Sequence, residues 1–337
     1  MITSATPSPE ALTHWQRELA QAISDPALLL QALRLDPALL PAAQQAAAQF
    51  PLRVTQHYLS LIPPGHPQDP LLRQVLPLAA ELQPVPGYHT DPVGDTQASS
   101  GHGVLQKYQG RALLITTGAC AIHCRYCFRR HYPYNTNNAL RHWHGMLETL
   151  AQQSDVDEVI LSGGDPLSLS DQRLHELIQQ IEAIPQVQRL RLHTRLPLVL
   201  PSRLTNTLIH RLQQCRLHIS LVLHCNHPNE LAPSLQPGLT ALRQVGVTLL
   251  NQSVLLAGVN DQATILKQLS TQLFAYGILP YYLHLLDPVQ GAAHFAVPEA
   301  QIAQLQQSLR AQLPGYLVPR IVREIAGAAA KTPFSTR

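Results

Sequence analysis

Three cysteines lie within eight residues of one another in the middle of the 337-residue chain. Cys120, Cys124 and Cys127 have the spacing Cys-x3-Cys-x2-Cys, which places three thiolates on one short loop. Such a loop can hold three corners of a [4Fe–4S] cube and leave the fourth iron open to a further ligand. The alternative is a structural zinc site completed by His123 or His131. Zinc sites usually pair Cys-x2-Cys with a second such pair, and this sequence has none.

The remaining cysteines, Cys215 and Cys225, stand apart from this loop. An odd total of five is not typical of a disulfide framework. We therefore expect these two to be buried free thiols, in a protein that works in a reduced compartment.

A second candidate group is the sequence LSGGDP at 161–166, which ends a short apolar run. Gly163 and Gly164 allow a ligand to approach the backbone closely, and the carboxylate of Asp165 can pair with an ammonium group. An ordinary strand-to-helix turn is the alternative, because the same residue types favour turns.

Lysine is rare in this chain: of 24 lysines and arginines, the lysines are Lys107, Lys267 and Lys331. Arginine stays protonated and cannot form a Schiff base, so any chemistry that needs a side-chain amine has three candidates. Lys331 follows small apolar residues, and a desolvated lysine is a competent nucleophile. The alternative is a solvated lysine on a frayed tail. Lys267 lies on a polar helix face, and we expect no role for it.

The composition excludes several classes of protein. Hydrophobic residues make up 45% of the chain, which suits a globular fold. The net charge of +3 is too small to indicate binding to nucleic acid or to an anionic membrane. No apolar run reaches the ~18 residues of a membrane span, and residues 1–7 lack the features of a signal peptide. We therefore expect a soluble cytoplasmic protein.

The elements that would position these residues begin after residue 110. Short apolar runs resemble buried parallel strands, and from the second run onward they start roughly 30 residues apart, the length of one βα unit. The runs are 112–116, 158–161, 189–193, 218–223, 247–251 and 279–284. Amphipathic helical stretches accompany them at 171–183, 203–214, 230–245, 261–275 and 298–313. This alternation predicts a parallel sheet, open or curled into an incomplete barrel, with ligands at the carboxyl ends of its strands.

The first third of the chain differs from the rest. Residues 1–108 are expected to be helical and irregular, with proline clusters that divide them into short pieces. The polar stretch 94–103 is typical of a connector.

The cysteine spacing, with Tyr126 before the last cysteine and Phe128 after it, resembles the radical S-adenosylmethionine (SAM) superfamily. In that superfamily the cluster binds SAM at its open iron, and one electron cleaves SAM to a 5′-deoxyadenosyl radical. The glycine-rich turn there contacts the SAM amino group. The resemblance implies an α/β fold, an incomplete (β/α)6-type radical SAM barrel over 109–316, with the helical extension before it.

The end of the chain resembles a narrower family. Small residues followed by KTP at 331–333 are similar to the pyridoxal phosphate (PLP) site of the lysine 2,3-aminomutase family. Further similar strings are FPLRVT at 50–55, HPNE at 227–230, NQSVLL at 251–256 and GVND at 258–261. The resemblance implies an isomerase that moves the α-amino group of free L-lysine to the β carbon, with 317–337 as the segment that carries PLP.

The resemblance also implies roles for residues at matching positions. PLP would be bound by Lys331 through its amine and by Lys107, Tyr108 and Arg111 through its phosphate. SAM would lie against Ser162, Gly163, Gly164, Asp165, His224 and Gln252. The lysine substrate would be held by Arg129 at its carboxylate and by Asp287 and Glu324 at its ε-ammonium.

Each of these roles has a simpler alternative. Residues 107–111 also suit a surface strand start, Arg129 a surface arginine, and His224 a core histidine. Glu324 replaces a shorter acid of the family and could instead form a local ion pair with Arg323 or Arg320.

The C-terminal end indicates one branch of the family. Some relatives carry a zinc-binding cysteine extension; no cysteine follows Cys225 here, so we expect no structural zinc. The short end and the string REIAG at 323–327 resemble the branch that supplies β-lysine for modification of elongation factor P. Expected partners are L-lysine, a reducing electron-donor protein and a downstream ligase of elongation factor P; the sequence does not indicate an oligomeric state.

Three other hypotheses remain open at this point. The first is an aminomutase for a different amino acid. The second is a non-catalytic, zinc-stabilised binding module, and the third is an enzyme that acts on lysine already attached to protein.

Overall fold

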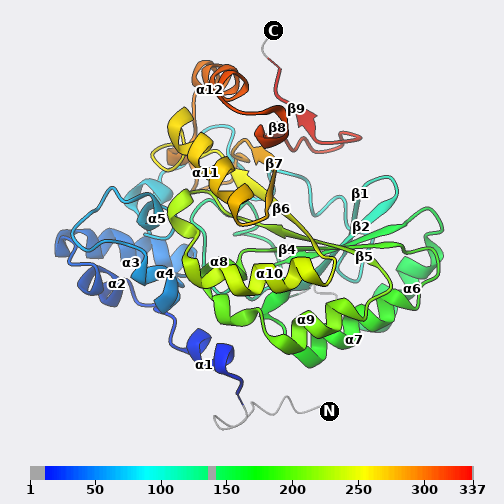
Figure 1. Ribbon diagram of the computed structural model, residues 1–337. Helices are drawn as coiled ribbons and strands as arrows, with labels where there is room; N and C mark the ends of the chain where they lie inside the picture. Colours follow the sequence, from blue (N-terminus) through cyan, green and yellow to red (C-terminus); the bar gives the residue numbers. More distant parts are fainter. Residues whose placement is uncertain (1–11, 136–141, 336–337) are drawn as a thin grey trace.

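The computed structural model describes residues 12–135 and 142–335. Residues 1–7, on which the expectation about a signal peptide rests, lie outside this range. A single sheet of nine strands forms the centre of the molecule (Figure 1). Its strands are β1 (Val104–Tyr108), β2 (Arg111–Thr117), β3 (Glu158–Gly163), β4 (Arg189–Thr194), β5 (His218–Leu223), β6 (Thr248–Val254), β7 (Leu279–His284), β8 (Arg320–Arg323) and β9 (Thr332–Pro333).

The strands follow one another in chain order across the sheet. Strands β2 to β8 are parallel, whereas β1 and β9 pair antiparallel at the two edges. Within the described residues no pairing joins β1 to β9, so the barrel is open, as the sequence predicts. The six predicted strands are confirmed as β2 to β7. Strands β1, β8 and β9 were not predicted, and through β8 and β9 the C-terminal segment continues the sheet.

Helices cover the outside of the sheet and build the N-terminal part of the chain (Figure 1). They are α1 (His14–Ala20), α2 (Pro26–Ala32), α3 (Leu40–Gln49), α4 (Gln56–Ser60), α5 (Pro70–Arg73), α6 (Trp143–Gln152), α7 (Asp171–Glu182), α8 (Leu196–Val199), α9 (Asn206–Gln213), α10 (Gln236–Gln244), α11 (Ala263–Ala275) and α12 (Glu299–Gln312).

Helix α7 shows why the predicted helices form. The Ser170 side chain accepts a hydrogen bond from the backbone N–H of Arg173, which satisfies one of the free donors at the helix start. Leu174, Leu177, Ile178 and Ile181 follow at helical spacing and are all buried. Helix α10 begins later than its prediction of 230, because Pro228 and Pro233 limit the preceding residues to two short 3-10 turns, Pro228–Glu230 and Pro233–Leu235.

The N-terminal helices share one hydrophobic core with the barrel. A continuous cluster of buried side chains runs from Trp15 in α1 to residues of β3, β4 and β5. The Thr55 hydroxyl caps α4 and also donates to the carbonyl of Val199 in the barrel. Trp15 lies under the buried guanidinium of Arg203, with 4.6 Å between the guanidinium carbon and the ring centre. The extension is therefore packed against the barrel as part of its core.

A buried ion cluster joins this extension to the cysteine loop. Glu81, in the 3-10 helix Ala79–Leu82, accepts hydrogen bonds from Arg125 at 2.9 and 2.6 Å and from Arg130 at 2.8 Å. Arg125 also donates to the carbonyls of Phe50 and Pro51. All three charged side chains are nearly inaccessible to solvent. Because two cations surround one carboxylate away from water, removal of the carboxylate would leave both uncompensated.

In the part of the chain that the structure describes, no helix combines the length and the apolar character needed to cross a membrane.

We predict that Glu81→Gln lowers the free energy of unfolding by roughly 3–5 kcal/mol, the usual cost of breaking a buried ion pair. The measurement is urea unfolding followed by circular dichroism. Glu299→Gln is the matched control, because Glu299 pairs with Arg323 at the surface, with 72% of its side chain exposed; we expect less than about 1 kcal/mol there. Equal effects for the two variants would contradict the prediction.

Candidate active site

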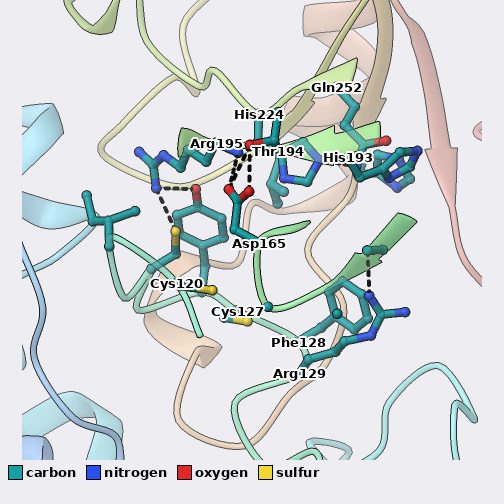
Figure 2. Close-up of a pocket in the computed structure, with 18 of the residues that line it drawn as sticks. Cys120, Cys127, Phe128, Arg129, Asp165, His193, Thr194, Arg195, His224 and Gln252 are labelled. Atoms are coloured by element: carbon teal, nitrogen blue, oxygen red, sulfur yellow. Dashed lines mark hydrogen bonds between the residues drawn. The ribbon is translucent and has the colours of Figure 1, made fainter. Parts of the chain in front are cut away.

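A cavity lies at the carboxyl ends of the parallel strands, where the sequence predicts a ligand site (Figure 2). Most of the residues that line it come from the carboxyl ends of β3, β4, β6 and β7, from the segments that follow β2, β3, β4, β5 and β7, and from the C-terminal segment. All predicted site residues line this cavity except three: it contains Cys120, Cys124, Cys127, Arg129, Ser162, Gly163, Gly164, Asp165, His224, Gln252, Asp287, Glu324 and Lys331. Lys107, Tyr108 and Arg111 do not line it.

The three cysteines of the loop after β2 face this cavity as free thiols. Between residues 118 and 135 this loop has no helix or strand, and one of its turns is closed by a hydrogen bond from the Cys127 N–H to the Cys124 carbonyl at 2.9 Å. Burial raises the pKa of the Cys120 thiol, and burial followed by the charge of Cys124 raises the pKa of Cys127 to about 11. Three thiolates so close together in a dry pocket repel one another. Iron ions would remove that repulsion, so this donor set fits a cationic cluster.

The two histidines of the zinc alternative contact other parts of the chain. His123 makes a hydrogen bond of 2.8 Å with the carbonyl of Pro51, and His131 one of 3.2 Å with the carbonyl of Gln290. Among the described residues, no three histidine, cysteine or acidic side chains are grouped as a single metal ion requires. The other two cysteines lie apart, with Cys225 buried and Cys215 partly buried, and neither forms a disulfide.

The glycine-rich turn after β3 packs against the cysteine loop itself. A Cβ atom on Gly164 would lie 2.4 Å from the carbonyl oxygen of Ala119, and one on Gly163 would lie 2.8 Å from that of Thr117. The Gly164 N–H donates to the Thr117 carbonyl at 2.6 Å, and the Asp165 N–H to that of Ala119 at 2.8 Å. The backbone of the cysteine loop therefore lies in the space that these glycines leave free. The same two glycines also line the cavity.

Asp165 is bound on all sides by its own chain. Its carboxylate accepts hydrogen bonds from the Thr194 hydroxyl at 2.7 and 2.9 Å and from the backbone N–H groups of Arg195 and Leu196 at 2.8 and 2.9 Å. A further bond comes from the N–H of Leu167. Figure 2 shows the contacts with Thr194 and Arg195 above Asp165. Asp165 thus joins the end of β3 to the end of β4. The sequence analysis expected it to pair with an ammonium group and did not predict this structural role.

Arg129 is buried and fixed by two polar partners. Its Nε donates to Asp95 at 2.6 Å and its Nη1 to the Ser162 hydroxyl at 3.1 Å, while the guanidinium stacks on the Phe128 ring. Burial alone would lower the pKa of Arg129, but the Asp95 carboxylate outweighs it and the pKa is raised. The surface-arginine alternative does not describe this environment, because only 8% of Arg129 is exposed.

Charged side chains continue from Arg129 to the C-terminal segment in a chain of alternating sign. Asp95 also binds the Lys107 ammonium at 2.6 Å, and Lys107 binds Glu324 at 3.0 Å. The other oxygen of Glu324 binds the Lys331 ammonium at 2.7 Å. Glu324 is thus paired with two lysines, and Arg323, one of the two local partners considered, is bound to Glu299 instead.

The two acids at this end of the cavity have opposite pKa shifts. Burial would raise the pKa of Glu324, but Lys331 and Lys107 overcome it and hold the pKa at about 2. Asp287, which follows β7, forms no ion pair with a residue in the described part of the chain. Burial and then the charge of Glu324 raise its pKa to about 7. The site therefore holds one carboxylate that is firmly ionised and one that is close to half-protonated at neutral pH.

Tyr108 and Arg111 lie at the hairpin between β1 and β2, where they pair with each other across the turn. The Arg111 guanidinium carbon lies 5.0 Å from the centre of the Tyr108 ring. Tyr108 and Lys107 line a neighbouring pocket whose other wall includes residues 325–328. The structure thus places the predicted phosphate-binding group beside the Lys331 segment.

Neutral imidazoles line the floor of the cavity. Gln252 hydrogen bonds to the Nε2 atom of His224 at 2.9 Å, and the His193 ring meets that of His224 edge-on. Burial, followed by the charge of Arg195, lowers the pKa of His224 to about 3. Burial followed by the charge of Lys331 does the same for His284.

Several residues of the cavity were missed by the sequence analysis. They are His193 and Thr194 at the end of β4, Arg195 after it, Asn226 after β5 and His284 at the end of β7. The available signal was their position, since each is a polar residue at or just after the carboxyl end of a predicted strand.

The chain is similar to several known proteins. Residues 101–193, which include the three cysteines and the LSGGDP turn, match the family described as a 4Fe-4S single cluster domain. The chain is 47% identical over 336 residues to the L-lysine 2,3-aminomutase of Escherichia coli (strain K12), covering 99% of this chain and 97% of that protein. It is 47% identical over 323 residues to the L-lysine 2,3-aminomutase of Haemophilus influenzae, covering 96% of each. Among solved structures, a radical SAM methyltransferase from Sphaerobacter thermophilus is 17% identical, with a TM-score of 0.44 over 65% of this chain and 68% of that one.

The raised pKa of Asp287 predicts a pH-dependent stability. Its folded-state pKa of about 7 exceeds the ordinary value of 3.8, so between these pH values the folded protein holds a proton that the unfolded protein releases. The free energy of unfolding contributed by Asp287 therefore falls as the pH rises from about 4 to 7, by up to a few kcal/mol.

In Asp287→Asn this fall is expected to be absent. Urea unfolding of the cofactor-free protein at pH 5 and pH 8 should show the variant gaining stability relative to wild type at the higher pH. Glu148→Gln, which alters an exposed carboxylate, is the control and should follow wild type. An unchanged pH dependence in Asp287→Asn would show that the carboxyl is ionised throughout.

Proposed function

The chain belongs to the L-lysine 2,3-aminomutase family of radical SAM enzymes, and from this premise we propose that it converts free L-lysine into β-lysine with PLP as a further cofactor. The observation that carries the proposal is the content of one cavity. Three cysteines, a buried arginine, two acids and a lysine amine line it together. A diamino acid has one carboxylate and two amines, and this cavity offers a partner for each.

The residues present fit the three cofactors of such a reaction. Cys120, Cys124 and Cys127 would hold the cluster, and the Lys331 amine would hold PLP. When bound, the cluster with SAM supplies a radical able to take a hydrogen atom from carbon, and PLP carries the migrating nitrogen. The protein's own contribution is to place the β carbon of lysine within reach of that radical.

Arg129 is the proposed clamp for the substrate carboxylate. Asp95 and Ser162 occupy its Nε and Nη1 atoms and so fix the plane of the guanidinium. A fixed planar fork suits bidentate binding of a carboxylate. Because the clamp is rigid, the position of the α carbon is determined before any chemistry begins.

Asp287 and Glu324 are the proposed partners of the substrate ε-ammonium. In the structure Glu324 is bound to Lys331. When the amine of Lys331 holds PLP, its ion pair with Glu324 would be lost. One oxygen of Glu324 would then be available for an incoming cation. Asp287 has no cation of its own among the contacts within the described residues, and its raised pKa falls when an ammonium arrives beside it.

We further propose that the β-lysine serves the modification of elongation factor P, and that a reducing protein donates the electron. The role in modification of elongation factor P rests on the string REIAG at 323–327, which resembles the branch of the family that supplies β-lysine for this modification. Incubation with lysine, ATP, elongation factor P and its ligase, followed by intact-mass analysis, tests it. A mass gain of one lysine that depends on this enzyme supports the role. A gain of the same size without the enzyme contradicts it.

We predict that Lys331→Ala forms no β-lysine above background when the protein is loaded with iron, sulfide and PLP and given SAM, dithionite and L-lysine anaerobically. Lys267→Ala is the control and should match wild type, because Lys267 lies exposed on α11. Products are measured by mass spectrometry.

A second readout is independent of turnover. Borohydride reduction should fix PLP to the wild-type protein at Lys331, as found by peptide mapping, and should fix none at that position in the variant. If wild type forms β-lysine while PLP is fixed elsewhere, the PLP assignment is wrong although the reaction is right.

A further inference from the structure

Arg195 follows β4 directly and is almost completely buried beside the cysteine loop, with 5% of its surface exposed. Its Nη1 donates a hydrogen bond to the Cys124 sulfur at 2.7 Å and another to the Tyr126 hydroxyl at 2.8 Å (Figure 2). Within residues 12–135 and 142–335, Arg195 is the one cationic side chain that hydrogen bonds to a sulfur of these three cysteines. A full positive charge therefore lies against one of the proposed cluster ligands.

The rest of the guanidinium is anchored by partners from both parts of the chain. Its Nη2 donates to Gln74 at 2.7 Å, to Glu230 at 2.8 Å and to the Tyr58 hydroxyl at 3.2 Å. Tyr58 and Gln74 come from the N-terminal helices, while Glu230 follows β5. Because both terminal nitrogens are bound, the guanidinium cannot turn away from the sulfur without breaking several buried hydrogen bonds.

The anchoring groups are in turn fixed by one another. Asn226 donates to Gln74 at 3.0 Å and to the Tyr126 hydroxyl at 2.7 Å. Glu230 accepts from the backbone N–H groups of Asn226 and His227, each at 3.0 Å. This connected network holds the two terminal nitrogens of the guanidinium and so determines where the charge lies relative to the sulfur.

We propose that Arg195 is a positioning residue that raises the reduction potential of the cluster by placing a hydrogen bond and a positive charge on the Cys124 sulfur. One-electron reduction makes a cluster more negative, and a nearby cation stabilises the reduced state more than the oxidised one. Hydrogen bonds to the sulfurs act in the same direction. The inference rests on the cluster-binding part of the proposed function and is independent of the reaction with lysine.

Glu230 allows a test of the direction in which charge shifts the reduction potential of the cluster. Its carboxylate binds the Nη2 atom of Arg195, whereas the sulfur is bound by Nη1, and it offsets part of the positive charge. Loss of the Arg195 charge should make the potential more negative, whereas loss of the Glu230 charge should make it less negative. Simple disruption of the pocket would not produce shifts of opposite sign.

The experiment is an anaerobic redox titration of the reconstituted full-length protein without lysine, with the reduced cluster followed by electron paramagnetic resonance. We expect Arg195→Gln to shift the potential to a more negative value, Arg195→Lys to shift it less, and Glu230→Gln to shift it the other way. Arg203→Gln is the matched control, because Arg203 is an equally buried arginine that pairs with Asp171. Its potential should equal that of wild type.

A potential in Arg195→Gln equal to that of Arg203→Gln would overturn the proposal. If Arg195→Gln binds no cluster, the comparison of Arg195→Lys with Glu230→Gln decides, and shifts of the same sign or no shifts would overturn it. Failure of the aminomutase reaction is seen separately, as absence of β-lysine from a wild-type protein whose cluster titrates normally.

Discussion

The carboxylate of Glu81, buried between Arg125 and Arg130, is the interaction on which the rest of the site depends. In its described residues the loop that carries the cysteines has no α-helix or strand, and its backbone hydrogen bonds, such as that from the Cys127 N–H to the Cys124 carbonyl, close single turns. Arg125 lies between Cys124 and Tyr126 in sequence and reaches Glu81 and the carbonyls of Phe50 and Pro51 in the extension. The extension thus acts as the outer half of the cysteine site, which explains why it shares a core with the barrel rather than packing as a separate unit.

On its inner side the cysteine loop packs against two glycines, which have no side chain to keep it away. Gly163 and Gly164 let the backbone of the loop lie against the end of β3, and no Cβ fits between them. Asp165 then binds Thr194 and the N–H of Arg195, so the ends of β3 and β4 are held at one level. Arg195 starts from this fixed point and reaches Cys124. The position of the Arg195 guanidinium therefore depends on the glycine turn, and the position of the glycine turn depends on the cysteine loop.

Much of this architecture could be predicted from the sequence, because parallel strands buried on both faces leave long apolar runs and their carboxyl ends lie at one edge. Strands β8 and β9 were missed since they are short and include exposed residues such as Arg320 and Arg323. Arg195 was missed for a different reason: its partners Tyr58, Gln74 and Glu230 are remote in sequence, and only the fold brings them together. The turn residue Asp165 was recognised, but its use in joining two strands depends on the neighbouring loop and not on the local sequence.

The balance of charge in the cavity connects these structural features to the proposed substrate. Asp95 lies between Arg129 and Lys107, and Glu324 between Lys107 and Lys331, so the buried cations and anions alternate and nearly neutralise one another. Asp287 is the exception, since burial and then the charge of Glu324 raise its pKa to about 7. A free lysine brings a carboxylate and two ammonium groups, a net positive charge. A cavity in which Asp287 can lose its proton on arrival of a cation accepts that net charge, whereas a substrate with an acidic side chain would require a further proton at Asp287.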